Sequence, residues 1–379
     1  MNYLILDTET SILNNGNPFT HENKLCYTGF GTSGTYTLLN TLTGTGYKET
    51  IQKAIDNSNW LVAFNAKFDC HWLERIGMDL SNIRIFDCQY AEFLFSNQQQ
   101  KYPSLEESCA NRGLGSKLDI IKEEYWNKGI STEDIPEELI LEYLQQDLIL
   151  TEKLYLLQLE QFKTTHKNLW RLFQLHMEDQ VILRTMERNG ILYETDKSIQ
   201  LGEKAEQQIK DIDHSFNLPT WFNFNSGDHL STWLYGGKID VDTRIPVGVF
   251  KTGNKIGQTR YKIVTHTYDF PRQFEPIKGS ELKKEGYYST DDSTISSLKG
   301  TKETKRLTSL LNERSKLEKL RGTYYTGFPK KITEMGWRNN YLHPTFNQCV
   351  AVTGRLSSTN PNGQNQPPES KQLCISRFT

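Results

Sequence analysis

The chain has 379 residues and a mass of 43.9 kDa, with 36% hydrophobic and 11% aromatic residues and a mean hydropathy of −0.62. At roughly 100–200 residues per domain, this length predicts two or three domains and excludes a single small binding module. No stretch approaches the roughly 18 apolar residues of a membrane span. No export signal precedes Asp7, so we expect a globular, cytoplasmic protein without membrane association.

The net charge of −2 conceals an uneven distribution along the chain. Residues 1–150 contain 11 Lys and Arg against 21 Asp and Glu, a net charge of −10, whereas residues 151–379 contain 33 against 25, a net charge of +8. An acidic part suits metal ions and a basic part suits a polyanion, although chance variation of surface charge is an alternative explanation. The six cysteines show no Cys-x-x-Cys pair and no zinc spacing, which indicates reduced thiols.

The N-terminal part of the sequence follows an α/β pattern. Apolar runs at 2–7 and 60–64 predict buried strands, segments 26–30 and 35–39 fit further strands, and 49–57 fits a helix. Residues 137–162, preceded by Pro136, have apolar residues at helical spacing. They predict a long helix that closes the first domain.

From about residue 169 the sequence becomes more helical and more basic. Residues 183–189 and 197–216 have helical character, and 303–321 predicts a strongly basic helix with a leucine face. Residues 244–275 mix β-forming residues with Gly, Lys and Arg, which indicates a basic excursion resembling a hairpin.

One acidic element lies at the end of the first predicted strand, and a second follows the predicted strand 60–64. Asp7 and Glu9 lie two residues apart at a strand end, so both carboxylates point to one side and can bind one hard cation. Such pairs are also common on protein surfaces. Asn65 and Asp69 follow the strand 60–64, where Asp69 could equally be a residue that favours the start of a helix.

The third acidic element lies on the helix 137–162. Tyr143 and Asp147 are four residues apart, which puts the phenol and the carboxylate on one helical face. An acid on an otherwise apolar face is unfavourable unless it is paired or binds a metal. Asp147 is therefore the most conspicuous ligand candidate, whereas we expect nearby acids such as Asp87 to have structural or capping roles.

The order Asp-x-Glu, Asn-x-x-x-Asp, Tyr-x-x-x-Asp resembles the three exonuclease motifs of the DnaQ-like, RNase H-fold 3′–5′ exonucleases. The resemblance implies an α/β RNase H-like domain over residues 1–165 that cleaves phosphodiesters with two Mg²⁺ or Mn²⁺ ions, which prefer oxygen ligands. It implies that the metals are held by Asp7, Glu9, Asp69 and Asp147. It further implies that Tyr143 orients the attacking water and that Asn65 contacts DNA.

The C-terminal part carries a second resemblance. Residues 353–365 (TGRLSSTNPNGQN) resemble the signature that precedes the first catalytic palm motif of family A (Pol I-like) DNA polymerases. Segments 186–191, 222–226, 288–292 and 317–327 are similar to thumb segments of that family. The resemblance implies a mostly helical, thumb-like DNA-binding region over 166–340 and an incomplete palm segment over 341–379. Residues 236–280 would be a basic insertion of phage type, for which a solvated loop is the alternative.

The same resemblance implies DNA contacts for individual residues. Those expected near a primer-template duplex are Thr353, Arg355, Gln364 and Asn365. Those expected to contact phosphates from the thumb-like helix are Arg314, Lys319 and Arg321, with a solvated surface position as the alternative for each. Gly363 and Gln366 stand where the family usually has apolar residues, which predicts looser local packing.

Together these motifs predict a metal-dependent 3′–5′ DNA exonuclease of the proofreading type used in DNA replication. The family's palm and fingers would begin only after residue 379, so we expect a split or truncated polymerase that cannot synthesise DNA without a second polypeptide carrying them. A phage origin would place it in the cytoplasm of a bacterial host. Two alternatives stay open: a catalytically silent DNA-binding scaffold that recruits the polymerase chain, and an RNase D-like RNA exonuclease.

Overall fold

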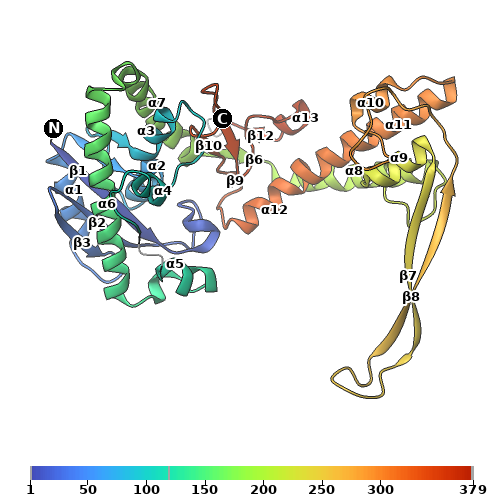
Figure 1. Ribbon diagram of the computed structural model, residues 1–379, viewed down its shortest axis with the longest axis horizontal. Coiled ribbons are helices and arrows are strands. Elements are labelled where there is room, and N and C mark those ends of the chain that lie inside the picture. Colours follow the sequence, from blue (N-terminus) through green and yellow to red (C-terminus); the bar gives the residue numbers. More distant parts are fainter. Residues whose placement is uncertain (1, 118–119, 377–379) are drawn as a thin grey trace. The chain divides into compact units, whose positions relative to one another are not determined.

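The computed structural model describes residues 2–117 and 120–376, and its backbone forms two compact units (Figure 1). The first unit comprises residues 1–195 and 328–379, and the second comprises residues 196–327.

A five-stranded mixed sheet forms the centre of the first unit. Its strand order is β3-β2-β1-β4-β5, with bounds β1 Tyr3–Thr10, β2 Leu25–Thr32, β3 Thr35–Asn40, β4 Trp60–Ala63 and β5 Arg84–Asp87. Strand β1 pairs antiparallel with β2 and parallel with β4. The strands predicted at 2–7, 26–30, 35–39 and 60–64 are confirmed. They form because runs such as Leu4 to Leu6, at most 5% exposed, are buried in the core.

Helices cover this sheet, and the longest of them, α6, packs on β1 and β2 (Figure 1). The helices of the first unit are α1 Tyr47–Asp56, α2 Ala66–Arg75, α3 Cys88–Phe95, α4 Leu105–Ala110, α5 Ile120–Glu124, α6 Glu137–Lys163, α7 Trp170–Asn189, α12 Gly327–Glu334 and α13 Pro368–Lys371. The helices predicted at 49–57 and 137–162 are confirmed within a few residues.

Two small β structures complete the first unit. One is a three-stranded sheet of order β12-β6-β9, with bounds β6 Ile191–Tyr193, β9 Tyr341–Leu342 and β12 Cys374–Ile375. The other is a hairpin of β10 Thr345–Asn347 and β11 Ser357–Thr359. The C-terminal segment from 341 therefore pairs with strand 191–193. Residues 377–379, at the end of the predicted palm segment, lie outside the described residues.

The compact units differ from the predicted domain boundaries at 165 and 340. Residues 166–195 and 328–340, expected in the thumb-like region, belong to the first unit. The physical reason is side-chain packing: Phe173 of α7 is fully buried against Phe86 and Phe162, with ring centroids 4.6 and 5.0 Å apart. A boundary drawn from local sequence character cannot detect such a contact.

The second unit consists of a helical cluster and a long β-hairpin. Its elements are α8 Thr195–Ser215, α9 Gly227–Tyr235, β7 Gly237–Val249, β8 Thr259–Phe270, α10 Asp292–Ser297 and α11 Lys302–Lys319. Its core is rich in aromatic side chains, among them Phe222, Phe224 and Trp233, with Leu234 and Leu311 packed against them. The hairpin-like excursion expected over 244–275 is the β7-β8 ribbon.

Within the described residues, no helix is both long and apolar enough to cross a lipid bilayer. All six cysteines lie in this part of the chain, and none of them forms a disulfide.

Candidate metal centre

Three of the predicted carboxylates come together at the centre of the first unit. Asp7 and Glu9 project from β1, and Asp147 projects from α6. One potential ligand atom from each lies within 4.8 Å of the others, and among the described residues these three are the acids so grouped. The spacing of two on a strand and the position of one acid on an apolar helical face produce this arrangement.

A glycine lets α6 approach the sheet closely enough to form the cluster. Gly29 of β2 is paired with Asp7 in the ladder. A Cβ placed on Gly29 would lie 2.6 Å from Leu148 Cδ1 and 3.0 Å from Leu144 Cγ, two side chains that flank Asp147 on the helix. A larger residue at this position would require Leu148 and Leu144, or this part of α6, to move.

The carboxylates interact unfavourably when all are ionised. Burial and the neighbouring Asp147 raise the pKa of Asp7 to about 7. Burial, together with Asp7 and Asp147, raises the pKa of Glu9 well above its usual range. Burial also raises the pKa of Asp147, although Lys117 acts in the opposite direction. A divalent cation would relieve this repulsion because its charge favours the ionised form of each ligand.

The hydrogen bonding of Asp147 is a second observation that fits a metal ion at this cluster. Asp147 Oδ1 is buried and accepts no hydrogen bond from any described residue, while its other oxygen, Oδ2, forms an ion pair with Lys117. A buried carboxylate oxygen without a partner is unfavourable and is a natural ligand for a hard cation. Carboxylates alone, with no His or Cys in the group, suit Mg²⁺ or Mn²⁺ better than zinc.

Tyr143 lies beside this cluster, one helical turn before Asp147. Its side chain is 7% exposed, and its phenol opposes the rise in the pKa of the Asp147 carboxyl. Burial raises the pKa of Tyr143 itself, so the phenol is protonated at neutral pH and can donate a hydrogen bond. Lys117 lies over its ring, with Nζ 5.0 Å from the centroid.

Asp69 is held near the cluster but is not one of the three grouped acids. It lies in the first turn of α2, is 2% exposed, and accepts a 2.7 Å hydrogen bond from Thr8 Oγ1. Burial and the charge of Asp7 raise its pKa well above the usual range. Asp69 is thus an electrostatic neighbour of the cluster, and its role as a metal ligand stays a prediction.

Asn65 marks the junction between β4 and α2. Its backbone has a φ of 63°, a left-handed conformation that Asn adopts more readily than most residues. The turn is supported by Asp87, which accepts hydrogen bonds from the N–H groups of Asn65 and Gln89 at 3.1 and 2.9 Å. Asp87 is also the N-cap of α3. The structural role expected for Asp87 is confirmed.

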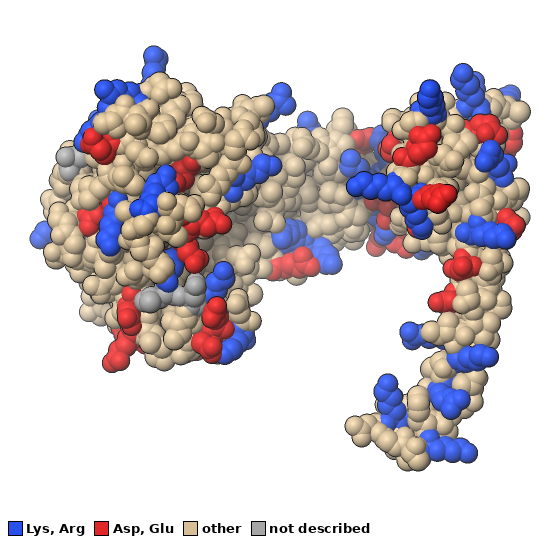
Figure 2. Space-filling model, viewed as in Figure 1, with Lys and Arg blue, Asp and Glu red and all other residues tan. Residues whose placement is uncertain are grey.

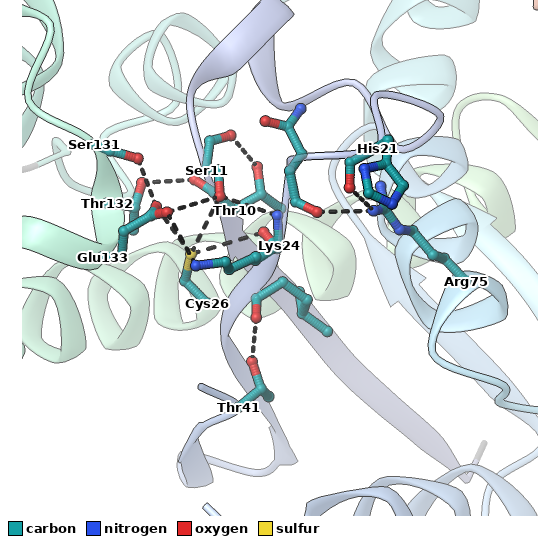
Figure 3. Close-up of polar contacts among 12 residues, drawn as sticks. Thr10, Ser11, His21, Lys24, Cys26, Thr41, Arg75, Ser131, Thr132 and Glu133 are labelled. Atoms are coloured by element: carbon teal, nitrogen blue, oxygen red, sulfur yellow. Dashed lines mark hydrogen bonds and ion pairs between the residues drawn. The ribbon is translucent and has the colours of Figure 1, made fainter. Parts of the chain in front are cut away.

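The chain that follows Glu9 is anchored by polar contacts on both sides (Figure 3). Thr132 donates a 2.6 Å hydrogen bond to the Thr10 carbonyl, and Ser11 donates to Glu133. Arg75 donates to the carbonyls of Pro18, Thr20, His21 and Asn23, which holds the loop between β1 and β2. These contacts restrict the end of β1 and hence the position of Glu9.

The predicted DNA-contacting residues have different environments. Thr353, Arg355, Gln364 and Asn365 are exposed. The backbone N–H groups of the last two donate to Asn362 Oδ1, which holds the turn that carries them. Gln366 is buried rather than loosely packed, and it accepts a hydrogen bond from Ser370.

The prediction for Arg314 requires a correction. Arg314 is 7% exposed, pairs with Asp213 at 2.5 Å and Asn225 at 2.8 Å, and its guanidinium is thereby used inside the second unit rather than offered to phosphates. Arg321 is paired with Glu318 at 2.7 Å, whereas Lys319 is exposed. Arg314 and Lys319 lie on α11, whereas Arg321 lies in the π-helical turn Leu320–Tyr325 that follows it. Helical periodicity could not show which of these residues face neighbouring acids.

Sequence patterns also did not identify two features of the first unit. Lys117 follows a Gly-rich stretch with no pattern that would single it out. Glu187, 2% exposed, accepts hydrogen bonds from Lys67 at 2.6 Å and from the Phe346 N–H at 2.6 Å, and it lies 2.7 Å from His71 Nε2. The sequence does not mark Glu187 as it marks Asp147, because the buried face of α7 near Glu187 also carries the polar Gln180 and Arg184.

Comparisons with known proteins match two segments of the chain. Residues 1–163 match the family model described as 3′-5′ exonuclease, and residues 269–377 match that of DNA polymerase family A. The first match contains the carboxylate cluster, and the second contains the segment 353–365. The α/β domain is therefore of the RNase H-like exonuclease type, followed by a helical region and part of a polymerase domain.

Several curated relatives are bacterial DNA polymerases I. That of Chloroflexus aurantiacus is 26% identical over 329 residues, covering 82% of this chain and 29% of the relative. That of Synechocystis is 27% identical over 314 residues, covering 81% and 27%. The chain thus spans less than a third of the length of these relatives.

Among solved structures, the polymerase domain of Pol1 from M. smegmatis, in complex with a DNA primer-template and dNTP, is similar in fold. The TM-score is 0.69 at 17% identity, and the match covers 98% of this chain and 53% of that chain.

Proposed function

We propose that this chain, which matches the 3′–5′ exonuclease model over residues 1–163 and the DNA polymerase family A model over residues 269–377, hydrolyses DNA from the 3′ end. The substrate of the proposed reaction is a single-stranded 3′ end, and its use is proofreading during replication. The observation that carries the proposal is the cluster of Asp7, Glu9 and Asp147 with its unpartnered buried oxygen.

In the proposed reaction each residue has a distinct task. Asp7, Glu9 and Asp147, with Asp69 beside them, would hold two Mg²⁺ or Mn²⁺ ions. Bound divalent ions would neutralise the negative charge that develops on the attacking and leaving oxygens of the phosphodiester. The protonated phenol of Tyr143 would donate a hydrogen bond that orients the attacking water, and Lys117 would supply a positive charge beside Asp147.

The test is digestion of 5′-labelled single-stranded DNA by the purified chain in Mg²⁺ and in EDTA. We expect stepwise shortening from the 3′ end only with the metal, and loss of shortening in Asp7→Ala with an unchanged circular dichroism spectrum. Asp56→Ala, which removes an exposed carboxylate from α1, is the matched control and should digest DNA normally. Undiminished digestion by Asp7→Ala would refute the assignment.

The same assay separates the two alternatives. A silent scaffold would bind DNA but would not shorten it in any metal. An RNase D-like enzyme would digest RNA in preference to DNA, but the match of residues 269–377 to polymerases favours DNA. A requirement for a second polypeptide in synthesis stays a prediction, which nucleotide incorporation by this chain, alone and mixed with a palm-and-fingers polypeptide, would test.

A further inference from the structure

The β7-β8 ribbon is the longest element of the second unit that is not covered by other elements (Figure 1). Its strands contain 13 and 12 residues, so the ribbon extends for about 40 Å at ~3.3 Å per residue. Only its base is packed: Ile239 is 7% exposed, and Tyr268 lies against Trp221 with ring centroids 4.5 Å apart. The part farther from the base, residues 243–264, is here called the distal ribbon.

The distal ribbon is exposed on both faces. Six apolar side chains are between 42% and 67% exposed: Ile245, Val247, Val249, Ile256, Tyr261 and Ile263. Two-stranded hairpins without a packed face are marginally stable in water. Backbone hydrogen bonds nevertheless continue to the tip, where the Phe250 N–H donates to the Gln258 carbonyl at 2.9 Å. A ribbon held in this form and left uncovered has the properties of a binding element.

The positive charge of the distal ribbon indicates that its ligand is a polyanion. The distal ribbon contains no Asp or Glu and carries five exposed cations, namely Arg244, Lys251, Lys255, Arg260 and Lys262. None of the five forms an ion pair with a described residue. The acids of the ribbon lie near its base, where Asp240 and Asp242 accept hydrogen bonds from Thr267 and Thr265. Figure 2 shows the same division, with red side chains near the base and blue side chains along the distal part.

The cations are distributed over both faces of the ribbon. Arg244 is paired with Ile263 in the ladder, and Lys262 is paired with Ile245 one position away. Because adjacent positions on a strand point to opposite faces, Arg244 and Lys262 project in opposite directions. A ligand that lay against one face of the ribbon would contact Arg244 or Lys262, but not both. The major groove of B-DNA, about 12 Å wide, admits a two-stranded β-ribbon and has phosphates on both sides.

We propose that the distal ribbon is a DNA-binding element that lies in the major groove of duplex DNA and contacts both phosphate backbones through these five cations. This inference deepens the proposed function and rests on it, because it takes duplex DNA next to a 3′ end as the ligand. The ribbon lies outside the two family matches except for its last two residues, so it is a feature that those matches do not account for.

The test replaces all five cations with Gln and measures binding of a labelled DNA duplex by fluorescence anisotropy in EDTA, which prevents digestion. We expect at least ~10-fold weaker binding at 0.15 M salt. The slope of log K against log salt concentration should decrease by about 2 to 4, because each phosphate contact contributes roughly 0.9. Circular dichroism and a melting curve check that the ribbon variant is folded.

Two control variants make the result specific. The first removes five exposed lysines from the first unit: Lys48, Lys53, Lys122, Lys163 and Lys167. It lowers the net charge by the same amount as the five-Gln variant of the ribbon does. We expect it to retain the parent slope of log K against log salt concentration. The second replaces Ile245, Val247 and Ile263 with Thr, which keeps the β-forming tendency and the cations, and should bind duplex DNA normally.

Three outcomes would overturn the proposal. Unchanged duplex binding in the five-Gln variant, or an equal loss in the five-lysine control, would show that the ribbon does not bind DNA. Loss of self-association or of a co-purifying protein in the Thr variant, with normal DNA binding in the five-Gln variant, would identify a protein partner instead. Digestion of single-stranded DNA is measured separately, so failure of the proposed nuclease function would be recognised independently of these results.

Discussion

Removal of one carboxylate from the candidate metal centre should stabilise the metal-free protein while it abolishes the proposed DNA hydrolysis. In Asp7→Asn the side chain keeps its shape but loses the charge that Asp147 and Glu9 oppose. The folded-state pKa of Asp7, about 7, exceeds its ordinary value of 3.8. The folded protein therefore binds this proton more tightly than the unfolded chain does. Stability is lost as pH rises from about 4 through about 7, and the loss is complete about one pH unit higher, where Asp7 is ionised in both states.

The magnitude follows from that difference. At ~1.36 kcal/mol per pKa unit, Asp7 destabilises the folded state relative to a neutral side chain by at most about 4 kcal/mol above pH 7, where it is ionised. At pH 5.5 the cost is about 2 kcal/mol, because the carboxyl must take up a proton on folding. We expect Asp7→Asn in EDTA to raise the free energy of unfolding by up to about 4 kcal/mol at pH 8, and by about half as much at pH 5.5. Mg²⁺ should narrow this difference at pH 8, because ligand at ~100 times its Kd stabilises the parent chain by about 2.7 kcal/mol, whereas the variant binds it poorly.

The assay is urea unfolding followed by circular dichroism at pH 5.5 and pH 8, in EDTA and in Mg²⁺, with Asp56→Asn as the matched exposed control. The reasoning is refuted if Asp7→Asn is less stable than the parent chain in EDTA at pH 8, or if the difference between the two proteins is the same at both pH values.

The remaining predictions concern the same unit. Single-stranded DNA cleavage at limiting Mg²⁺ should rise with pH through about 7, since protons compete with the metal for the carboxylates; a flat rate profile would contradict this. Tyr143→Phe should slow cleavage roughly 10-fold or more, corresponding to one lost hydrogen bond, while Mg²⁺-dependent stabilisation measured by melting is retained. Gly29→Ala should destabilise the fold by about 1–3 kcal/mol in urea and weaken Mg²⁺ binding by calorimetry, because α6 is displaced; equal Mg²⁺ affinity would exclude that displacement. Glu187→Ala should cost about 3–5 kcal/mol in urea, since it leaves Lys67 without its buried partner, and a loss below ~1 kcal/mol would show that the pair is dispensable.

Local patterns in the sequence predicted strands and helices of this protein and the pairs of side chains that share a face. The alternation of residues on a strand predicted that Asp7 and Glu9 share a side, and the spacing of four predicted that Tyr143 and Asp147 share a helical face. The apolar runs that became β1 and β4 and the long helix α6 were recognisable because the backbone geometry of each depends on nearby residues. The assignment of Asp87 to a capping role follows from the same local chemistry.

Tertiary structure alone decided which of these local features meet. Gly29 leaves room for Leu144 and Leu148 where α6 packs on the sheet beside Asp7, and no pattern within either segment contains that information. Arg314 was indistinguishable from its basic neighbours until the fold placed it against Asp213. The length of the β7-β8 ribbon was also hidden, since residues 244–275 predicted a basic excursion resembling a hairpin but not strands of 13 and 12 residues. Contacts between distant segments depend on the shapes of both surfaces, whereas periodicity reports only the face that each segment presents.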